Sequence, residues 1–277
     1  CTTSGTLTDT DSDLLVHYGF NNNLNDVKNS NGDGRYNLVN TGGTIKFAQG
    51  CGYGNAGYFD ATTGYAYNNN FISDNIPTLT GNFTIAMWVN GDVDNGAYSS
   101  VYASGNKGYA NHQIDVDSKN TPQLRLLMYN NGSQLGIEDP AQITNGQWYH
   151  VAAVHDDQNN FTLYKNGVAV QTKTAASTFT QFRVGTNRKA NNNWKGYIDE
   201  VKVFGRAFDG DDVKNACLLY GHCNNLTTPA KPDNLTAVVG VTSGRVDLSW
   251  NSVVGADNYT LYISKDNVNF TAISPVI

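Results

Sequence analysis

Short runs in which apolar and polar residues alternate recur along the first 220 residues of the chain, with turn-forming residues between them. The clearest runs span residues 14–20, 57–59, 83–89, 112–117, 123–129, 148–155, 161–165, 182–185 and 196–204. A period of two places successive side chains on opposite faces of a β-strand. The Asn-Gly pairs at 131–132, 145–146 and 166–167 favour the positive φ angles of tight turns. Many short strands joined by such turns predict an all-β fold, an antiparallel sandwich of two sheets.

The composition favours the same fold class and excludes several functions. The 277 residues include 37 Asn and 28 Gly, whereas residues that favour helices are scarce. The net charge of −6, with only 18 Lys and Arg, argues against nucleic-acid binding. The chain contains no run of ~18 apolar residues, the length that would cross a membrane as a helix. One short helical turn is expected through residues 212–216, capped by Asp209 or Asp211.

The sequence pattern changes after residue 223. Residues 1–13 are polar, residues 224–232 contain Pro229 and Pro232, and alternating runs restart after the second proline. Proline favours extended connecting segments. The sequence therefore predicts a polar N-terminal tether (1–13), a large β domain (14–223), a linker (224–232) and a second β unit (233–277).

Six segments of the large domain occur in the order in which one known family carries them. They are residues 15–20 (LVHYGF), 57–60 (GYFD), 83–89 (FTIAMWV), 146–152 (GQWYHVA), 163–167 (LYKNG) and 196–204 (GYIDEVKVF). With these motifs the chain resembles the laminin-G-like (LamG-like) jelly rolls of the concanavalin A-like lectin/glucanase superfamily. The resemblance implies a jelly-roll sandwich of two antiparallel sheets, with six or seven strands in each.

Residues 233–277 resemble the first half of a fibronectin type III domain, an immunoglobulin-like sandwich. The matching segments are 232–235, 246–250 and 259–262. Half a sandwich exposes an unpaired strand edge and an apolar face. We therefore expect the natural polypeptide to continue beyond Ile277, or a partner chain to supply the missing strands in a self-assembling or filamentous protein.

The scarcity of glutamate argues against catalysis. Enzymes of the superfamily use two Glu a few residues apart on one strand, and a retaining glycosidase needs its carboxylates about 5–5.5 Å apart. The two glutamates of this chain, Glu138 and Glu200, are far apart in sequence. Asp115 and Asp117 share a strand face, but their shorter side chains do not match the family arrangement. We expect no catalytic residues.

Calcium is the cofactor that the resemblance implies. The family often carries a structural Ca²⁺ at the sheet edge, with the Asp of the last strand motif as a ligand, which is Asp199 in this sequence. Asn21 and Asp26 would add oxygen ligands from the N-terminal segment. Ca²⁺ accepts carboxylate, amide and carbonyl oxygens; the alternative is that Asp199 only caps a turn.

A candidate sugar site follows from alternation. In residues 112–117 and 123–129 the apolar side chains point inward, which leaves Gln113, Asp115, Arg125 and Tyr129 on the outer face. Planar amides, carboxylates, guanidinium groups and aromatic rings are the groups that bind sugars. Tyr102 and Trp194, in the flanking loops, are expected to overhang this face. The alternative is an ordinary surface patch, because Tyr and Asn are abundant throughout the chain.

Four cysteines allow three pairings, and the close spacing of Cys217 and Cys223 makes this pair the first choice for a disulfide. Cys1 precedes a polar stretch, as in a mature bacterial lipoprotein. Its alternatives are a disulfide or the start of a fragment.

Together these patterns predict an extracellular or surface-anchored, calcium-stabilised protein with a non-catalytic binding or adhesive function. A glycan or another cell-surface polymer is the expected partner. The alternatives are a structural subunit of a surface assembly, or an accessory module of a larger glycan-degrading enzyme.

Overall fold

The computed structural model describes the following residues: 11–28, 32–42, 45–50, 54–61, 65–68, 79, 81–92, 97–104, 111–119, 121–130, 133–177, 179, 182–219, 234, 236–239, 246–251, 259–265 and 270–276. The chain divides into two compact units, residues 1–223 and 224–277.

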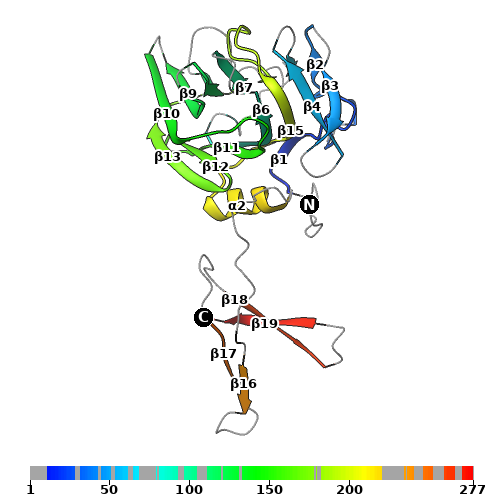
Figure 1. Ribbon diagram of the computed structural model, residues 1–277, viewed down its shortest axis with the longest axis vertical. Coiled ribbons are helices and arrows are strands. Elements are labelled where there is room, and N and C mark those ends of the chain that lie inside the picture. The colour runs from blue at the N-terminus through cyan, green and yellow to red at the C-terminus, as the bar shows by residue number, and fades with distance from the viewer. Residues whose placement is uncertain are drawn as a thin grey trace. The chain divides into compact units, whose positions relative to one another are not determined.

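An eight-stranded antiparallel sheet forms one layer of the first unit (Figure 1). Its strands, in spatial order, are β13 (Val168–Thr174), β12 (Asn160–Lys165), β11 (Tyr149–His155), β6 (Phe83–Gly91), β15 (Lys195–Phe204), β4 (Asn55–Asp60) and β3 (Lys46–Gln49). The eighth strand, β1 (Leu14–Tyr18), pairs with the second half of β15, whereas β4 pairs with its first half. The length of β15 therefore accounts for the strand beyond the expected six or seven.

A seven-stranded antiparallel sheet forms the second layer. Its order is β10 (Ser133–Gln142), β9 (Gln123–Asn130), β8 (Asn111–Asp117), β7 (Tyr98–Ser104), β14 (Phe182–Val184), β5 (Ala66–Asn68) and β2 (Val39–Asn40). The all-β antiparallel sandwich predicted from alternation is therefore confirmed. The nine predicted strand runs coincide with β1, β4, β6, β8, β9, β11, β12, β14 and β15.

The core lies between the two sheets, and alternation decides which side chains enter it. In β6, for example, Phe83, Ile85 and Met87 join the central cluster, whereas Ala86 and Trp88 face the other side of the sheet. Most buried hydrophobic residues of the first unit belong to this central cluster. The two outer faces of the sandwich are therefore the places where binding sites can form.

Helix α2 (Gly210–Leu219) packs on the outer face of the eight-stranded sheet (Figure 1). Asp209 caps its N-terminus, because its Oδ1 accepts the N–H of Asp212 at 2.8 Å, while Asp212 Oδ2 accepts the N–H of Asp209 at 3.2 Å. This reciprocal arrangement is a capping box. The predicted helical turn is confirmed, with Asp209 rather than Asp211 as its cap.

The second unit contains two hairpins. Strand β16 (Thr236–Val239) pairs with β17 (Val246–Ser249), and β18 (Tyr259–Ser264) pairs with β19 (Phe270–Val276). Strands β17 and β18 coincide with segments 246–250 and 259–262, β16 directly follows segment 232–235, and β19 was not anticipated. Nowhere in the described part of the chain is there a helix long and apolar enough to cross a membrane.

Candidate functional site

A polar cavity of about 280 Å³ lies on the outer face of the seven-stranded sheet. The segment between β14 and β15 completes its wall. We call it the polar cavity, and its lining residues are Tyr98, Gln113, Asp115, Arg125, Leu127, Tyr129, Gln134, Asn187, Arg188, Lys189, Asn191 and Asn192. It lies at the small end of the range for ligand sites, a size that suits a single small ligand.

Strand register brings the polar side chains of the floor together. Strands β8 and β9 are neighbours, and Asp115 lies opposite Arg125 while Gln113 lies opposite Leu127. Because each strand alternates, all four side chains point away from the core. The predicted group of Gln113, Asp115, Arg125 and Tyr129 therefore does share one face and one cavity.

Arg125 is the centre of a hydrogen-bonded network in the floor. Its Nε donates to Asp115 Oδ1 at 2.9 Å and its Nη1 donates to Asp117 Oδ2 at 3.0 Å. The guanidinium carbon lies 4.7 Å from the centre of the Tyr98 ring. Asp115 is only 1% exposed and Arg125 8%, so the predicted solvated face is in fact a nearly buried ion pair.

Gln113 extends this network and has an unused acceptor. Its Nε2 donates to Asp115 Oδ2 at 2.8 Å and also contacts Ser100 Oγ at 3.5 Å. Its Oε1 is buried and has no hydrogen-bond partner in the described structure. A buried acceptor without a donor costs about 1–3 kcal/mol, so a ligand hydroxyl that donated to it would remove this cost.

Burial and ion pairing act in opposite directions on the pKa values of the floor. Burial raises the pKa of Asp115, although the hydrogen bond and positive charge of Arg125 oppose the rise. The pKa of Arg125 is raised above its usual range, because Asp115 and Asp117 outweigh the opposing effect of burial. Arg125 is therefore a permanent cation whose charge is already balanced.

The wall segment, residues 186–194, is held in place by its own side chains. Asn187 Oδ1 accepts the N–H groups of Lys189 and Asn191, and Asn187 Nδ2 donates to Asn191 Oδ1 at 2.9 Å. Arg183 Nη1 donates to the Arg188 carbonyl at 2.6 Å. Asparagine side chains commonly fix turns in this way. The segment thereby presents Arg188 and Lys189 over the sheet.

Tyr102 and Trp194 were wrongly predicted to overhang the site. Tyr102 belongs to strand β7 and is fully buried, with its Oη 2.7 Å from His112 Nε2 inside the core. Trp194 is also fully buried, and its Nε1 donates to the carbonyl of Tyr197 at 3.3 Å. Its ring occupies the space in which a side chain at Gly91 would lie. Neither ring is available to a ligand.

The residues that sequence reasoning missed are Tyr98, Leu127, Gln134 and the wall residues of 187–192. Continued alternation along β9 could have identified Leu127, which lies between Arg125 and Tyr129. The wall residues gave no local signal, because their position over β9 depends on the path of the chain between the two sheets.

Two of the predicted calcium ligands lie at the same turn, which joins β3 to β4. Asp199 is fully buried; its Oδ1 accepts the N–H of Glu200, and its Oδ2 lies where a side chain at Gly50 would be. Asn21 Oδ1 accepts the N–H of Asn55 at 2.8 Å, at the other end of the turn. A carboxylate and an amide oxygen are both ligand types that Ca²⁺ accepts.

Asp26, the third predicted ligand, has a different set of contacts. Its Oδ1 accepts the N–H of His17 at 2.9 Å and that of Lys28 at 3.1 Å, and its carboxylate is buried. These bonds fix the segment that follows β1. Within the described residues, no group of three or more His, Cys, Asp or Glu side chains is placed to hold a metal ion.

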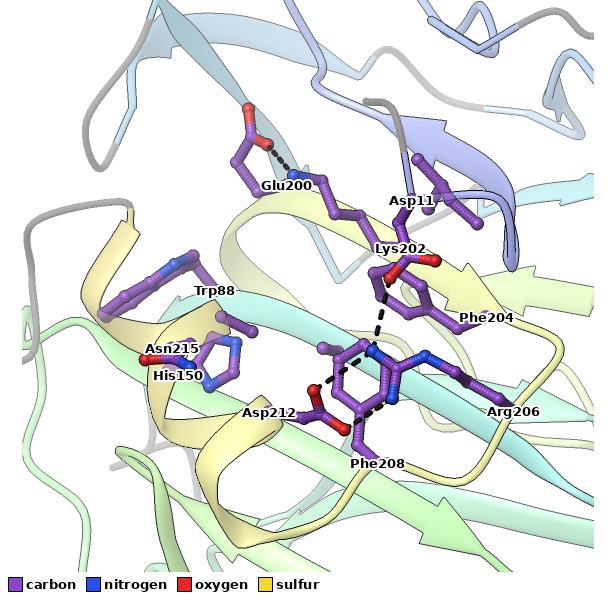
Figure 2. A pocket seen from close by; sticks show the side chains of 13 residues that line it. Asp11, Trp88, His150, Glu200, Lys202, Phe204, Arg206, Phe208, Asp212 and Asn215 are labelled. Carbon is purple, nitrogen blue, oxygen red and sulfur yellow. Dashed lines mark hydrogen bonds and ion pairs between the residues drawn. The ribbon is translucent and has the colours of Figure 1, made fainter. Parts of the chain in front are cut away.

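A second cavity, the helix cavity, has a volume of about 140 Å³ and lies between α2 and the outer face of the eight-stranded sheet (Figure 2). Its lining combines apolar side chains with polar and charged ones in about equal number. The lining residues are Asp11, Leu14, Ala86, Trp88, His150, Glu200, Lys202, Phe204, Arg206, Phe208, Asp212, Asn215 and Ala216.

The charged side chains of the helix cavity are paired with one another, as the dashed lines of Figure 2 show. Glu200 Oε2 lies 3.3 Å from Lys202 Nζ and 2.6 Å from His17 Nε2. Arg206 Nη2 lies 3.1 Å from Asp212 Oδ1 and 3.3 Å from Asp11 Oδ2. These ion pairs link the sheet, the helix and the start of the domain. Their function is therefore structural.

His150 lines the same cavity and is neutral at physiological pH. Burial, together with the charge of Lys202, lowers its pKa to about 3. Its ring meets that of Trp88 edge to face at 5.2 Å, and its Nδ1 is buried without a hydrogen-bond partner. A neutral histidine is the form that an apolar cavity favours.

The predicted disulfide and lipidation sites are not tested by the structure. Cys217 is buried in α2, but Cys223 and Cys1 lie outside the described residues. Both assignments therefore stay predictions.

The two stacked antiparallel sheets form a jelly-roll sandwich. Residues 60–214 match the family described as the concanavalin A-like lectin/glucanases superfamily. The match covers more than half of the chain, so the chain belongs to this superfamily. No curated protein sequence matches it significantly.

Several solved structures share the fold. Domain 4 of AbnA, a GH43 extracellular arabinanase from Geobacillus stearothermophilus solved in complex with arabinotriose, is 20% identical, with a TM-score of 0.59 over 74% of this chain and 98% of that domain. The binding domain of botulinum neurotoxin DC, solved in complex with SialylT, is 16% identical, with a TM-score of 0.56 over 74% of this chain. This chain spans about half of the toxin domain, 51% of its length. At such low identities, the TM-scores show a common fold and nothing further.

Proposed function

We propose that the chain is a non-catalytic carbohydrate-binding protein that binds a sugar in the polar cavity. The observation that carries the proposal is the buried, unpartnered Oε1 of Gln113 beside the Asp115–Arg125 ion pair. Sugar hydroxyls are donors as well as acceptors, so a hydroxyl suits this position better than an apolar ligand would. The surrounding amides of Gln134, Asn191 and Asn192 add further donors and acceptors.

The aromatic rings of the cavity have a supporting function in this proposal. The guanidinium groups of Arg125 and Arg188 lie over the rings of Tyr98 and Tyr129, at 4.7 Å and 3.4 Å from the ring centres. These ring faces are therefore covered. We expect recognition through hydrogen bonds rather than by stacking of a sugar ring on an exposed aromatic platform.

The contacts of the carboxylates support a non-catalytic function. Arg125 and Gln113 occupy the two oxygens of Asp115. Asp117 accepts from Arg125 and from the N–H of Lys119. A general acid or base must reach the substrate within hydrogen-bond distance, whereas these carboxylates are engaged with the protein. Glu138 is exposed on β10 and Glu200 lies in the other sheet, so the two glutamates do not form a catalytic pair.

The structural neighbours give the proposal independent support. Domain 4 of the arabinanase was solved with arabinotriose, and the toxin binding domain with SialylT. The fold alone does not assign a ligand, but it accommodates carbohydrate in more than one of these proteins. An extracellular or surface location, a fibronectin type III second unit and a Cys217–Cys223 disulfide are consistent parts of the same proposal.

Calcium is proposed as a structural ion at the β3–β4 turn, held by Asp199 and Asn21. An ion that binds only the folded state raises the melting temperature. We expect CaCl₂ to raise the melting temperature of the wild type and EDTA to lower it. Asp199→Ala should remove the response, whereas Asp157→Ala, at an exposed aspartate, should keep it. An equal response in both variants would contradict the assignment.

A glycan microarray followed by calorimetry tests the proposed function. The wild type should bind at least one saccharide, and Gln113→Ala and Arg125→Ala should weaken binding about tenfold or more, since each removes hydrogen-bonding groups from the floor. Arg35→Ala is the matched control, because Arg35 is an exposed arginine beside the Tyr36 ring outside the cavity. Absence of binding to every saccharide, or equal binding by Gln113→Ala, would contradict the proposal.

A further inference from the structure

We infer that the polar cavity selects acidic saccharides, which are sugars that carry a carboxylate, and that Arg188 binds this carboxylate. This inference rests on the proposed function and names its ligand class. The inference depends on ion pairing: in the described residues, two cations of the polar cavity have no ion pair, whereas the charged groups of the helix cavity are paired with one another.

Arg188 and Lys189 bring positive charge to the cavity without a balancing carboxylate. In the described residues neither side chain has an ion pair, whereas Arg125 is paired with both Asp115 and Asp117. Together with Asp117, which pairs with Arg125, the site holds three cationic side chains and two carboxylates, in a chain whose net charge is −6. An excess of positive charge at this one site would attract and hold an anionic ligand.

Arg188 contacts the Tyr129 side chain and retains further N–H donors, because a guanidinium group carries five. The guanidinium carbon lies over the Tyr129 ring, 3.4 Å from its centre, and Arg188 also forms a hydrogen bond with the Tyr129 side chain. A stacked guanidinium keeps its N–H donors in the plane, where they match the two oxygens of a carboxylate. Stacking also restricts the side chain before a ligand arrives, which lowers the entropic cost of binding.

The backbone around Arg188 is fixed as well. The Arg188 carbonyl accepts from Arg183, and the neighbouring N–H groups of Lys189 and Asn191 donate to Asn187. Ala190 adopts a positive φ of 56°, which turns the chain within this segment. These contacts place Arg188 in a built wall of the cavity rather than on a free surface loop.

The floor and the wall would then divide recognition of the ligand between them. Gln113 offers an acceptor to a hydroxyl of the sugar ring, while Arg188 offers paired donors to its carboxylate. Lys189 is exposed, so it contributes longer-range attraction that salt screens more strongly. Uronic acids and sialic acids carry both kinds of group, a ring of hydroxyls and a carboxylate.

Calorimetry with matched pairs of saccharides tests the inference. The pairs are trigalacturonate with its methyl ester, sialyllactose with lactose, and sulfated with unsulfated galactose. The wild type should bind the carboxylated member of at least one of the first two pairs about tenfold or more tightly than its neutral partner, and 500 mM NaCl should reduce this preference. A preference for the sulfated sugar alone would overturn the assignment to a carboxylate.

Variants separate the acid preference from sugar binding in general. Arg188→Ala should weaken binding of the acid about tenfold or more and so remove the preference, with a much smaller effect on the neutral partner. Arg188→Lys should keep only part of the preference. Arg35→Ala is the matched control and should behave as the wild type. If acidic and neutral partners bind equally and only Gln113→Ala weakens them, the acid preference is wrong and the sugar-binding function stands. If no saccharide binds, both are wrong.

Discussion

The polar cavity and the helix cavity lie on the two outer faces of the same sandwich, and they differ in how their charges are balanced. In the helix cavity Glu200, Lys202, Arg206 and Asp212 are all paired with opposite charges. In the polar cavity the wall cation Arg188 stacks on a tyrosine and has no carboxylate within reach in the described structure. Paired charges stabilise a fold, whereas a fixed and unpaired cation is available to a ligand.

The largest expected effect tests the structural nature of the helix cavity. Glu200→Ala removes the carboxylate that Lys202 and His17 contact, and breaking a buried ion pair costs about 3–5 kcal/mol. Urea unfolding should show this decrease, while saccharide binding by the folded fraction should not change. The control is Glu138→Ala, at the exposed glutamate of β10, which we expect to alter stability very little. Similar stability of the two variants would contradict the comparison.

The second prediction concerns pH and the neutral histidine of the helix cavity. Burial lowers the pKa of His150 to about 3, below the value near 6.5 in an unfolded chain. Between these values the unfolded state binds the additional proton, so stability is full above about pH 6.5 and falls as the pH decreases. The slope from this group approaches about 1.4 kcal/mol per pH unit.

His150→Gln should reduce this slope in melting curves recorded between pH 4 and pH 7. His112 should still contribute, because burial lowers its pKa to about 3 as well. The measurement is the change of slope rather than the absolute stability, since the substitution also alters packing. An unchanged slope would show that His150 is not a buried neutral group.

A smaller effect is expected at the start of α2. Asp212→Ala removes the acceptor of the Asp209 N–H and one carboxylate partner of Arg206. The loss of this capping hydrogen bond and of a partly exposed ion pair costs about 1 kcal/mol. Asp211→Ala changes the neighbouring exposed aspartate and serves as the control. The melting temperature should fall for Asp212→Ala alone, and an equal fall in both variants would refute the role of Asp212.

The smallest effect is expected in the polar cavity. Arg188→Ala should change the free energy of unfolding by about 0.5–1 kcal/mol, because exposed cation–π contacts contribute no more than this. Urea unfolding checks the value. A loss as large as that of Glu200→Ala would show that Arg188 is a structural residue, and the contrast between the two cavities would disappear.

The floor of the polar cavity could be predicted from the sequence because it depends on local alternation. Gln113 and Asp115 lie on one face of β8 for the same reason that Ile114 and Val116 enter the core. What alternation did not predict was burial: the outer face is covered by the wall segment, so Asp115 is 1% exposed.

Tyr102 and Trp194 were misplaced for two different physical reasons. Strand β7 is rich in serine, and its Ser99, Ser100 and Ser104 are buried, so the strand lacks a clear apolar pattern. Trp194 follows a run of asparagines that is typical of an exposed loop. These asparagines form hydrogen bonds with nearby polar side chains; for example, Thr186 Oγ1 donates to Asn193 Oδ1. The indole of the adjacent Trp194 can therefore enter the core.

Strand β15 and its flanking segments have a consequence for how such a protein could change. Residues 187–192 form the wall of the polar cavity, β15 supplies Glu200 and Lys202 to the helix cavity, and the chain then continues into α2. One continuous stretch, residues 187–216, therefore contributes to both outer faces. Exchanging this stretch between related sandwiches would therefore change the wall of the polar cavity and the ion pairs beneath α2 at the same time.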